Sequence, residues 1–251
     1  MEYDGLRELY LAGVRWEITD VPLVRANIKQ ATQPAQNPAS AGRTATCVVP
    51  PIAPVAPISI DTAVSMAARP ADIDALNRMI GEFNHPLRAS ATNTVGIHVA
   101  TQPNGMIIVT DMPGADDDAS GKILTGACGD LMDKMLAAIG MGREHVSILP
   151  MIFWRTPGGR TPSREEIDLA QPFVNRAIEL LKPRLILTLG TLPATELAGI
   201  NLGRAHGVPA ETKSNIPVMP IYHPNYLILK PAAKRDVWNA LQNVQNLLKS
   251  A

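Results

Sequence analysis

Arg184-Leu-Ile-Leu-Thr-Leu-Gly190 is the stretch of sequence that decides the fold. Its apolar residues follow one another without the polar alternation of a half-buried strand, so the pattern predicts a strand that is covered on both faces. Gly190 ends this strand, and a helical pattern follows as far as Ala198. On the N-terminal side, Ser163 and Glu166 have the spacing of a capping box, which predicts the start of another helix. A buried strand between two helices is typical of a parallel sheet.

Three further short apolar runs are predicted as strands, at residues 106–110, 146–149 and 218–222. Helical patterns alternate with them, at residues 72–82, 131–139, 163–181 and 232–248. Pro172 should kink the third of these helices, because proline lacks the amide hydrogen that an interior helical position donates. The alternation predicts an α/β fold, in which a four-stranded parallel sheet is flanked by helices on both faces.

Residues 31–60 have the composition of a flexible linker. Six prolines and seven alanines occupy this stretch, and Arg43 is its only charged residue. Residues 1–30 include apolar residues at helical spacing, which predicts a short amphipathic segment. The chain is therefore divided into an N-terminal amphipathic segment (1–30), a Pro/Ala-rich linker (31–60) and an α/β domain (62–251). The amphipathic segment could dock within the chain or capture a protein partner, and the sequence does not choose between the two.

The composition excludes several classes of protein. Lys plus Arg and Asp plus Glu each total 23, so the chain does not coat nucleic acid by bulk charge, although residues 171–251 hold nine basic and four acidic residues. Two cysteines, Cys47 and Cys128, are too few for a disulfide scaffold or for a four-cysteine zinc or iron–sulfur site. The sequence shows neither a membrane-spanning apolar stretch nor the start of a secretory signal, which predicts a cytoplasmic protein without a membrane partner.

Open parallel sheets hold their sites at the carboxyl ends of the strands, so the loops after the predicted strands are where chemistry is expected. Asp111 follows the strand at 106–110, where a buried carboxylate could activate a water or could merely cap backbone amides. His223 follows the strand at 218–222, where its imidazole could donate to a developing oxyanion or be ordinary polar surface. Asp111 and His223 are therefore the candidate catalytic residues.

Two other loops also carry polar groups of interest. The loop Arg155-Thr-Pro-Gly-Gly-Arg160-Thr-Pro162 is rigid, and its two guanidinium groups could clamp phosphates or be exposed without a function. Trp154 beside it could stack on a base or fill the core. Residues 112–122 fail the spacing of a phosphate-binding loop. Asp116–Asp118 is interpreted as a solvated acidic turn and not as a magnesium site.

Several blocks, taken in order, resemble the uracil-DNA glycosylase superfamily, in particular its iron–sulfur-containing bacterial branch. The resemblance extends from about Ala91 to the C-terminus. Its blocks are Asp111-Met-Pro-Gly-Ala-Asp116 with Gly121-Lys122, Leu131 to Gly140, Trp154 to Pro162 with Glu165-Glu-Ile167, Leu185 to Gly190 with Ala194, and His223-Pro-Asn-Tyr-Leu227 with Ala232 to Trp238. Each block is loose by itself, but the set in one order is specific.

The resemblance implies DNA base-excision repair by hydrolysis of the N-glycosidic bond of a deaminated base. The family carries its acidic catalytic residue in the first loop, where Asp111 stands with a shorter reach than the family's glutamate. The family's last loop supports the leaving uracil anion with a histidine, which here is His223. Leu124 stands where the family has its stacking aromatic residue, and Pro150 where it has the asparagine that reads the pyrimidine edge. The expected base-pocket residues are Met112, Pro113, Gly114, Leu124 and Pro150.

The resemblance also bears on cofactors and partners. Trp154 and Ala170 occupy positions of the family's cluster cysteines, and the region ahead of Ala91 contains His85-Pro86, so we expect no iron–sulfur cluster and no metal. We expect weak, sequence-independent DNA binding through four basic residues, Arg155, Arg160, Lys234 and Arg235. Two functions stay open: an active glycosylase, or a catalytically degenerate protein that binds DNA or a repair partner. The block 223–227 disfavours a third, an unrelated nucleotide-binding protein, because it has no place in a dinucleotide site.

Overall fold

The computed structural model describes residues 59–250, which belong to one compact unit. The predicted amphipathic segment, and the linker as far as residue 58, lie outside the described residues. The first element described is helix α2 (Ile60–Ala67), whose capping residue Ser59 and first residue Ile60 lie within the predicted linker (31–60). Its N-terminus is capped by Ser59, whose side-chain oxygen accepts a hydrogen bond of 3.2 Å from the amide of Thr62.

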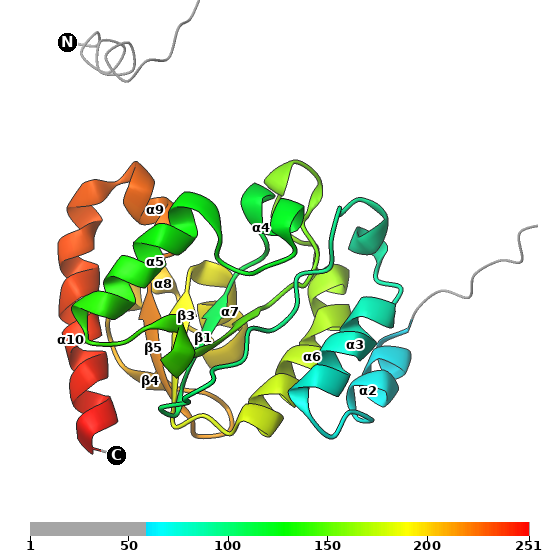
Figure 1. Cartoon of the computed structure of the whole chain (residues 1–251), viewed down its shortest axis with the longest axis horizontal. Coiled ribbons are helices and arrows are strands. Elements are labelled where there is room, and N and C mark those ends of the chain that lie inside the picture. The colour runs from blue at the N-terminus through cyan, green and yellow to red at the C-terminus, as the bar shows by residue number, and fades with distance from the viewer. Residues whose placement is uncertain (1–58, 251) are drawn as a thin grey trace, which may run out of the picture. The chain divides into compact units, whose positions relative to one another are not determined.

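A five-stranded sheet lies at the centre of this unit (Figure 1). The strands are β1 (Met106–Thr110), β2 (Ser147–Pro150), β3 (Leu185–Leu189), β4 (Ala210–Glu211) and β5 (Pro217–Ile221). Their order is β2-β1-β3-β5-β4; β4 is antiparallel to β5, and the other neighbours are parallel. The four predicted parallel strands are confirmed, but the predicted strand count is one too low. The edge strand β4 has only two residues, too few to form an apolar run.

Helices lie on both faces of the sheet, as predicted. Helices α5, α9 and α10 cover one face, and α2, α3, α6 and α7 pack on the other (Figure 1). Besides α2, the α-helices are α3 (Ile73–Glu82), α4 (Ala115–Ser120), α5 (Gly126–Ala138), α6 (Arg164–Leu181), α7 (Thr191–Ala198), α8 (Leu202–Ala205), α9 (Pro224–Leu229) and α10 (Lys234–Ser250). Short 3₁₀ turns occupy Pro86–Ala89, Arg143–His145, Pro157–Gly159 and Pro231–Ala233. Among the described helices, none has the length and apolar character needed to cross a membrane.

Successive residues of one strand point into two different hydrophobic cores. In β1, Ile107 and Val109 pack with the α2, α3, α6 and α7 side, whereas Met106 and Ile108 pack with α5 and α10. All four side chains are buried, because each face of the sheet has its own helical layer. This double burial explains why the strands show no polar alternation in the sequence.

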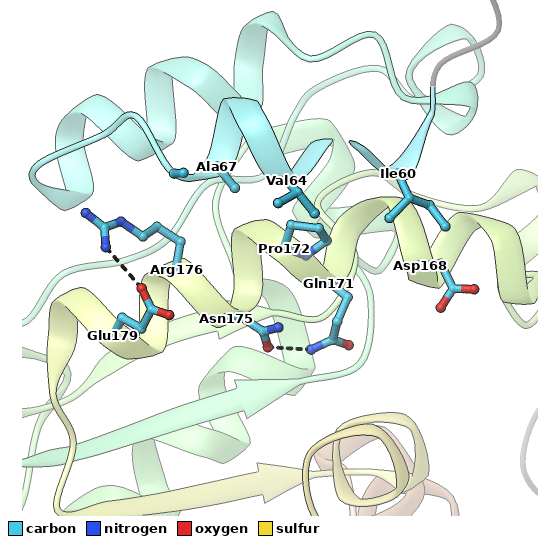
Figure 2. A pocket seen from close by; sticks show the side chains of 10 residues that line it. Ile60, Val64, Ala67, Asp168, Gln171, Pro172, Asn175, Arg176 and Glu179 are labelled. Atoms are coloured by element: carbon cyan, nitrogen blue, oxygen red, sulfur yellow. Dashed lines mark hydrogen bonds and ion pairs between the residues drawn. The ribbon is translucent and has the colours of Figure 1, made fainter. Parts of the chain in front are cut away.

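Helix α6 begins at the predicted capping box. The Ser163 side chain accepts from the Glu166 amide at 3.2 Å, and the Glu166 carboxylate accepts from the Ser163 amide at 2.6 Å. The helix continues through Pro172 to Leu181. Figure 2 shows α2 lying along α6, with Val64 and Pro172 between the two helices. These residues help to line a cavity of about 610 Å³. None of the residues that line this cavity is a predicted site residue.

The prediction of a solvated turn at Asp116–Asp118 is wrong for two of its three residues. All three aspartates lie in α4, and two of them, Asp117 and Asp118, are buried. Asp118 accepts hydrogen bonds from the amides of Thr92 and Asn93, at 2.8 and 3.1 Å. The Asp117 carboxylate accepts from backbone amides on both sides of α4. The two carboxylates therefore satisfy backbone donors, and within residues 59–250 no group of three or more His, Cys, Asp or Glu side chains is placed to hold a metal.

Candidate active site

The carboxyl ends of four strands lie in register at one edge of the sheet. Thr110 is paired with Pro150 of β2 and with Leu189 of β3, and Leu189 is paired with Ile221 of β5. The loops that follow β1, β2, β3 and β5 therefore start side by side. This edge brings together Asp111 and His223, which are 112 positions apart in the sequence.

The Asp111 carboxylate lies against the start of α7. Its Oδ1 accepts a hydrogen bond of 3.2 Å from the amide of Leu192, in the first turn of that helix. Burial raises the pKa of Asp111 to about 7, and the hydrogen bond from Leu192 opposes part of this shift by favouring the ionised form. Asp111 is thus a half-buried carboxyl whose proton is exchanged near neutral pH, which suits a group that accepts a proton during catalysis.

Gly190 makes room for this carboxylate. A Cβ atom on Gly190 would collide with both carboxylate oxygens of Asp111. The residue also has φ +98°, a conformation that L side chains rarely adopt. Its amide donates to the carbonyl of Ile221 at 3.0 Å, which ties the end of β3 to the end of β5. Gly190 is therefore required for the approach of Asp111 to α7.

The His223 imidazole has a defined tautomer in this hydrogen-bond network. Its Nδ1 accepts from the amide of Asn225 at 3.1 Å, at the start of α9, so the ring proton lies on Nε2. Nε2 then donates to the hydroxyl of Thr110, 3.1 Å away. Burial lowers the pKa of His223 to about 4, and the negative charge of Asp117 opposes that shift. The imidazole is neutral at pH 7 and presents one N–H donor.

Thr110 is a site residue that the sequence analysis missed. Its buried side chain links the end of β1 to the loop after β5 through the hydrogen bond to His223. The signal in the sequence is the position of Thr110, a hydroxyl at the last residue of an apolar strand and directly before Asp111. Its partner is 113 residues away, and only the strand order reveals the pairing.

Comparison with known proteins extends the resemblance seen in the sequence. A family model described as the uracil DNA glycosylase superfamily matches residues 99–242, which is more than half of the chain. The chain belongs to the uracil DNA glycosylase superfamily.

Curated relatives support this membership of the uracil DNA glycosylase superfamily. The type-4 uracil-DNA glycosylase of Pyrobaculum aerophilum is 32% identical over 142 residues, covering 53% of this chain and 72% of the relative. The protein of the same name from Archaeoglobus fulgidus is 28% identical over 158 residues, covering 59% and 79%. That from Thermotoga maritima is 28% identical over 169 residues, covering 65% and 88%. The names of these relatives support a glycosylase-like role in DNA repair.

The five expected base-pocket residues differ in their burial and in their position in the fold. Met112 is half-buried and its sulfur lies 3.2 Å from the Thr156 hydroxyl, whereas Pro113 is buried and Gly114 is exposed at the start of α4. Pro150 is buried at the end of β2, opposite Thr110. Leu124 is only 1% exposed and packs in the core beneath α5 and α10. The structure thus places Pro150 and Met112 at the carboxyl edge, and Leu124 in the core.

The predicted DNA-contacting arginines lie in one loop but have different surroundings. Arg155 is half-buried, and Arg160 is exposed. Arg160 already pairs with Glu166 of α6 through two contacts, of 2.8 and 2.5 Å. This pairing lowers the pKa of Glu166 to about 2. Lys234 and Arg235 are exposed at the start of α10. A phosphate would have to compete with Glu166 for Arg160, which leaves Arg155, Lys234 and Arg235 as the less committed cations.

Trp154 fills the core, which decides between the two interpretations of the sequence. Its indole is fully buried and stacks on the His85 ring, with centroids 4.5 Å apart and planes 7° apart. The indole N–H donates to Thr94 at 3.0 Å, and His85 Nε2 lies 3.0 Å from the carbonyl oxygen of Glu166. Phe83 packs against both rings.

Trp154, Ala170 and the segment around His85 stand where the resemblance places the cysteine ligands of an iron–sulfur cluster. Trp154 and Ala170 offer no thiolate, and the segment before Ala91 brings His85 onto the indole instead. Each of the three side chains is at most 1% exposed and closely packed. A cluster held by cysteine thiolates does not fit this set of residues.

Proposed function

We propose that this superfamily member is a DNA glycosylase of base-excision repair, which hydrolyses the N-glycosidic bond of a deaminated base. The single observation that carries the proposal is the pairing of the His223 N–H donor with Thr110, directly beside Asp111, at the carboxyl edge of the sheet. This arrangement supplies a donor for a leaving anion and a carboxylate for water or for the positive sugar. Uracil is the first candidate base, because the curated relatives are named for it.

His223 would stabilise the departing base. When the glycosidic bond breaks, negative charge develops on an oxygen of the base, and a fixed N–H donor at that place lowers the barrier. A neutral imidazole can serve this purpose, because the step needs a hydrogen bond and not a proton transfer. In the free protein the Thr110 hydroxyl accepts from Nε2, and the base oxygen would take over that hydrogen bond.

Asp111 would act on the water or on the oxocarbenium-like sugar. A pKa of about 7 makes the group a competent proton acceptor at neutral pH. Its side chain is shorter than the glutamate of the family, and one carboxylate oxygen is bound to Leu192. We therefore expect Asp111 to contribute less to the rate than His223.

A second function, DNA binding without excision, is supported by the residues at the base-pocket positions. Pro150 offers no side-chain hydrogen bond to a pyrimidine edge, and Leu124 is packed in the core instead of stacking on a base. Leaving the polar edge of a bound base unpaired costs roughly 1–3 kcal/mol. This penalty weakens base recognition but leaves the Asp111 and His223 groups in place.

DNA is the proposed partner in both functions. Binding is expected to be weak and independent of sequence, because it would rest on the basic side chains Arg155, Lys234 and Arg235 with a smaller part for Arg160. We further propose that the fold forms without an iron–sulfur cluster or other metal. A protein partner for residues 1–30 and a cytoplasmic location stay predictions.

The test is incubation of the full chain with single- and double-stranded oligonucleotides that carry uracil, hypoxanthine or xanthine, followed by alkaline cleavage. The proposal expects strand cleavage at one or more of these bases. His223→Ala should reduce cleavage below detection in this assay, and Asp111→Asn should only reduce it. Binding of the same oligonucleotides without cleavage at any base would establish the second function in place of the first.

A further inference from the structure

Asp117 of α4 carries a buried carboxylate that the proposed mechanism does not use. Only 7% of the residue is exposed, and both of its oxygens accept hydrogen bonds. Oδ2 accepts from the amide of Gly114 at 3.0 Å, and Oδ1 accepts from the amide and the hydroxyl of Thr125, at 2.6 and 2.7 Å. A helix cap would need only the contact with Gly114. The two contacts with Thr125 join α4 to the start of α5, eight residues further along the chain.

The two partners of this carboxylate belong to two different loops. Gly114 ends residues 111–114, which begin with the proposed catalytic carboxyl group, and we call them the carboxylate loop. Thr125 lies in residues 121–126, which include Leu124, and we call them the leucine loop. Both loops contain residues that are expected to form the base pocket. The shared carboxylate therefore makes the position of one loop depend on that of the other.

The leucine loop has a strained backbone that contacts on two sides hold in place. Leu124 has φ +50°, in the left-handed region that residues other than glycine rarely adopt. On one side, Arg143 donates to the carbonyl of Ile123 at 3.1 Å and also to the carbonyl of Leu124. On the other side, Thr125 donates to Asp117. Strain of this kind persists where the surrounding structure determines the conformation, and it is concentrated at functional sites.

We propose that Asp117 is a positioning residue, which holds the carboxylate loop and the leucine loop at the separation that base excision requires. The proposal rests on the proposed function, because both loops contain base-pocket positions. Asp117 acts through its two loops and not on the base, since both of its oxygens are occupied by the protein. Misplacement of a reacting group by about 1 Å can slow a reaction about 10²-fold. The link therefore affects the rate of the chemical step and not the affinity for DNA.

Asp117→Asn breaks this link with little change in shape. An asparagine has one acceptor oxygen, so a carboxamide that turns its oxygen to Thr125 presents its NH₂ group to the Gly114 amide, and two donors meet. Single-turnover excision of uracil at saturating protein should slow about 10- to 100-fold. The protein concentration that gives the half-maximal rate should stay the same, because DNA contacts are not involved.

The sign of this effect separates the link from the charge of Asp117. Burial lowers the pKa of His223, and the negative charge of Asp117 opposes that shift, so the carboxylate lies close to the proposed anion site. Loss of this charge alone would favour a departing anion and speed the reaction. A slower reaction of Asp117→Asn therefore identifies the lost link.

Thr125 offers a variant that leaves every charge in place. Thr125→Val keeps the shape of the side chain and the amide donor but loses the hydroxyl that donates to Asp117. Excision should slow roughly 2- to 10-fold, the loss expected for one hydrogen bond. Thr125→Ser keeps a hydroxyl and should restore most of the rate.

Asp118→Ala is the matched control. Asp118 is the next residue of α4, is also 7% exposed, and accepts from the amides of Thr92 and Asn93. Its loss leaves buried backbone donors unpaired and should lower the unfolding temperature. The excision rate should stay unchanged, because the hydrogen bonds of Asp118 reach neither loop.

Amide hydrogen exchange tests the link without any excision. Asp117→Asn should speed exchange at Gly114 and Thr125, whereas Asp118→Ala should change neither. The proposal is overturned if Asp117→Asn excises like the original chain or leaves exchange at both amides unchanged. It is also overturned if Asp118→Ala slows excision as much, or if Thr125→Ser is as slow as Thr125→Val. An original chain that excises no base would overturn the proposed function, and exchange at the two amides would then decide whether Asp117 holds the loops together.

Discussion

Burial moves the two proposed catalytic groups toward their uncharged forms. The pKa of Asp111 rises to about 7 and that of His223 falls to about 4, in each case chiefly because the charged form loses water. The two groups affect stability in opposite directions. Between about pH 4 and 6.5, a rise in pH weakens the folded state through Asp111 and strengthens it through His223. Above that interval only the Asp111 effect continues, until the pH passes its folded pKa.

Replacing Asp111 should therefore change stability in a pH-dependent way. The folded chain holds the Asp111 proton up to about pH 7, whereas the unfolded chain releases it near the usual value of 3.8. The free energy of unfolding of the original chain therefore falls as pH rises from 5 to 8, and Asp111→Asn removes this decrease. The variant should gain about 2–3 kcal/mol relative to the original chain between pH 5 and 8. Thermal or urea unfolding at the two pH values measures this, and a constant difference would contradict the raised pKa.

At the scale of elements, the junction between β3 and α7 decides where Asp111 lies. Gly190→Ala would add a Cβ atom against the carboxylate and would also strain a backbone with φ +98°. We expect a loss of stability of several kcal/mol, or displacement of Asp111, together with loss of any excision. Urea unfolding and the excision rate report the two effects.

Gly199→Ala is the control for the Gly190 prediction. Gly199 ends the same helix with φ +67°, and a Cβ atom there would meet nothing within 4 Å. It should lose only about 1 kcal/mol through backbone strain and keep full activity. Equal effects of Gly190→Ala and Gly199→Ala would show that the contact with Asp111 is irrelevant.

The stack of Trp154 on His85 joins the loop after β2 to the segment before Ala91. We predict that this stack takes the structural place of an iron–sulfur cluster. Trp154→Ala removes an indole that is fully buried and should lower stability by roughly 3–5 kcal/mol. A chelator, in contrast, should leave the unfolding temperature of the original chain unchanged, and the purified protein should contain no iron. Stoichiometric iron, or a chelator-dependent unfolding temperature, would contradict the absence of a cluster.

At the scale of the whole molecule, the sequence predicts the parts of the fold that rest on continuous burial. The β1 and β3 strands are visible because every residue is apolar or nearly so, and α6 because Ser163 and Glu166 cap it. The edge strand β4 is not visible, because two residues in a loop leave no pattern. The start of α2 is hidden because its capping residue, Ser59, lies in a stretch of linker composition.

The candidate site is also predictable from the sequence only in part. Asp111 and His223 are predictable because each directly follows a strand that belongs to a parallel sheet. The contact between Thr110 and His223 is not predictable, because it joins the end of β1 to the loop after β5, and these two strands are not neighbours in the sheet. The pairing of Arg160 with Glu166 is also not predictable, because the spacing of Ser163 and Glu166 already accounts for the carboxylate as part of a capping box.

DNA binding by the whole molecule should depend on salt through a few cations. Arg155→Ala should weaken binding and reduce the slope of log affinity against log salt by about one. Arg160→Ala should have a smaller effect, because its guanidinium is already paired with Glu166. Arg69→Ala, an exposed arginine that follows α2, serves as the control and should change nothing. Fluorescence anisotropy over a salt series measures these slopes, and unchanged values for Arg155→Ala and Arg160→Ala together would show that the DNA face lies elsewhere.

The central claim is that His223 stabilises a departing base anion at the carboxyl edge of the sheet. The most direct test compares single-turnover excision of uracil and of 5-fluorouracil, which leaves more readily because its anion is more stable. His223→Ala should slow uracil excision by about 10²- to 10³-fold. The same variant should slow 5-fluorouracil excision clearly less, because that anion needs less help. Equal losses on the two bases, no loss, or no excision by the original chain would contradict the claim.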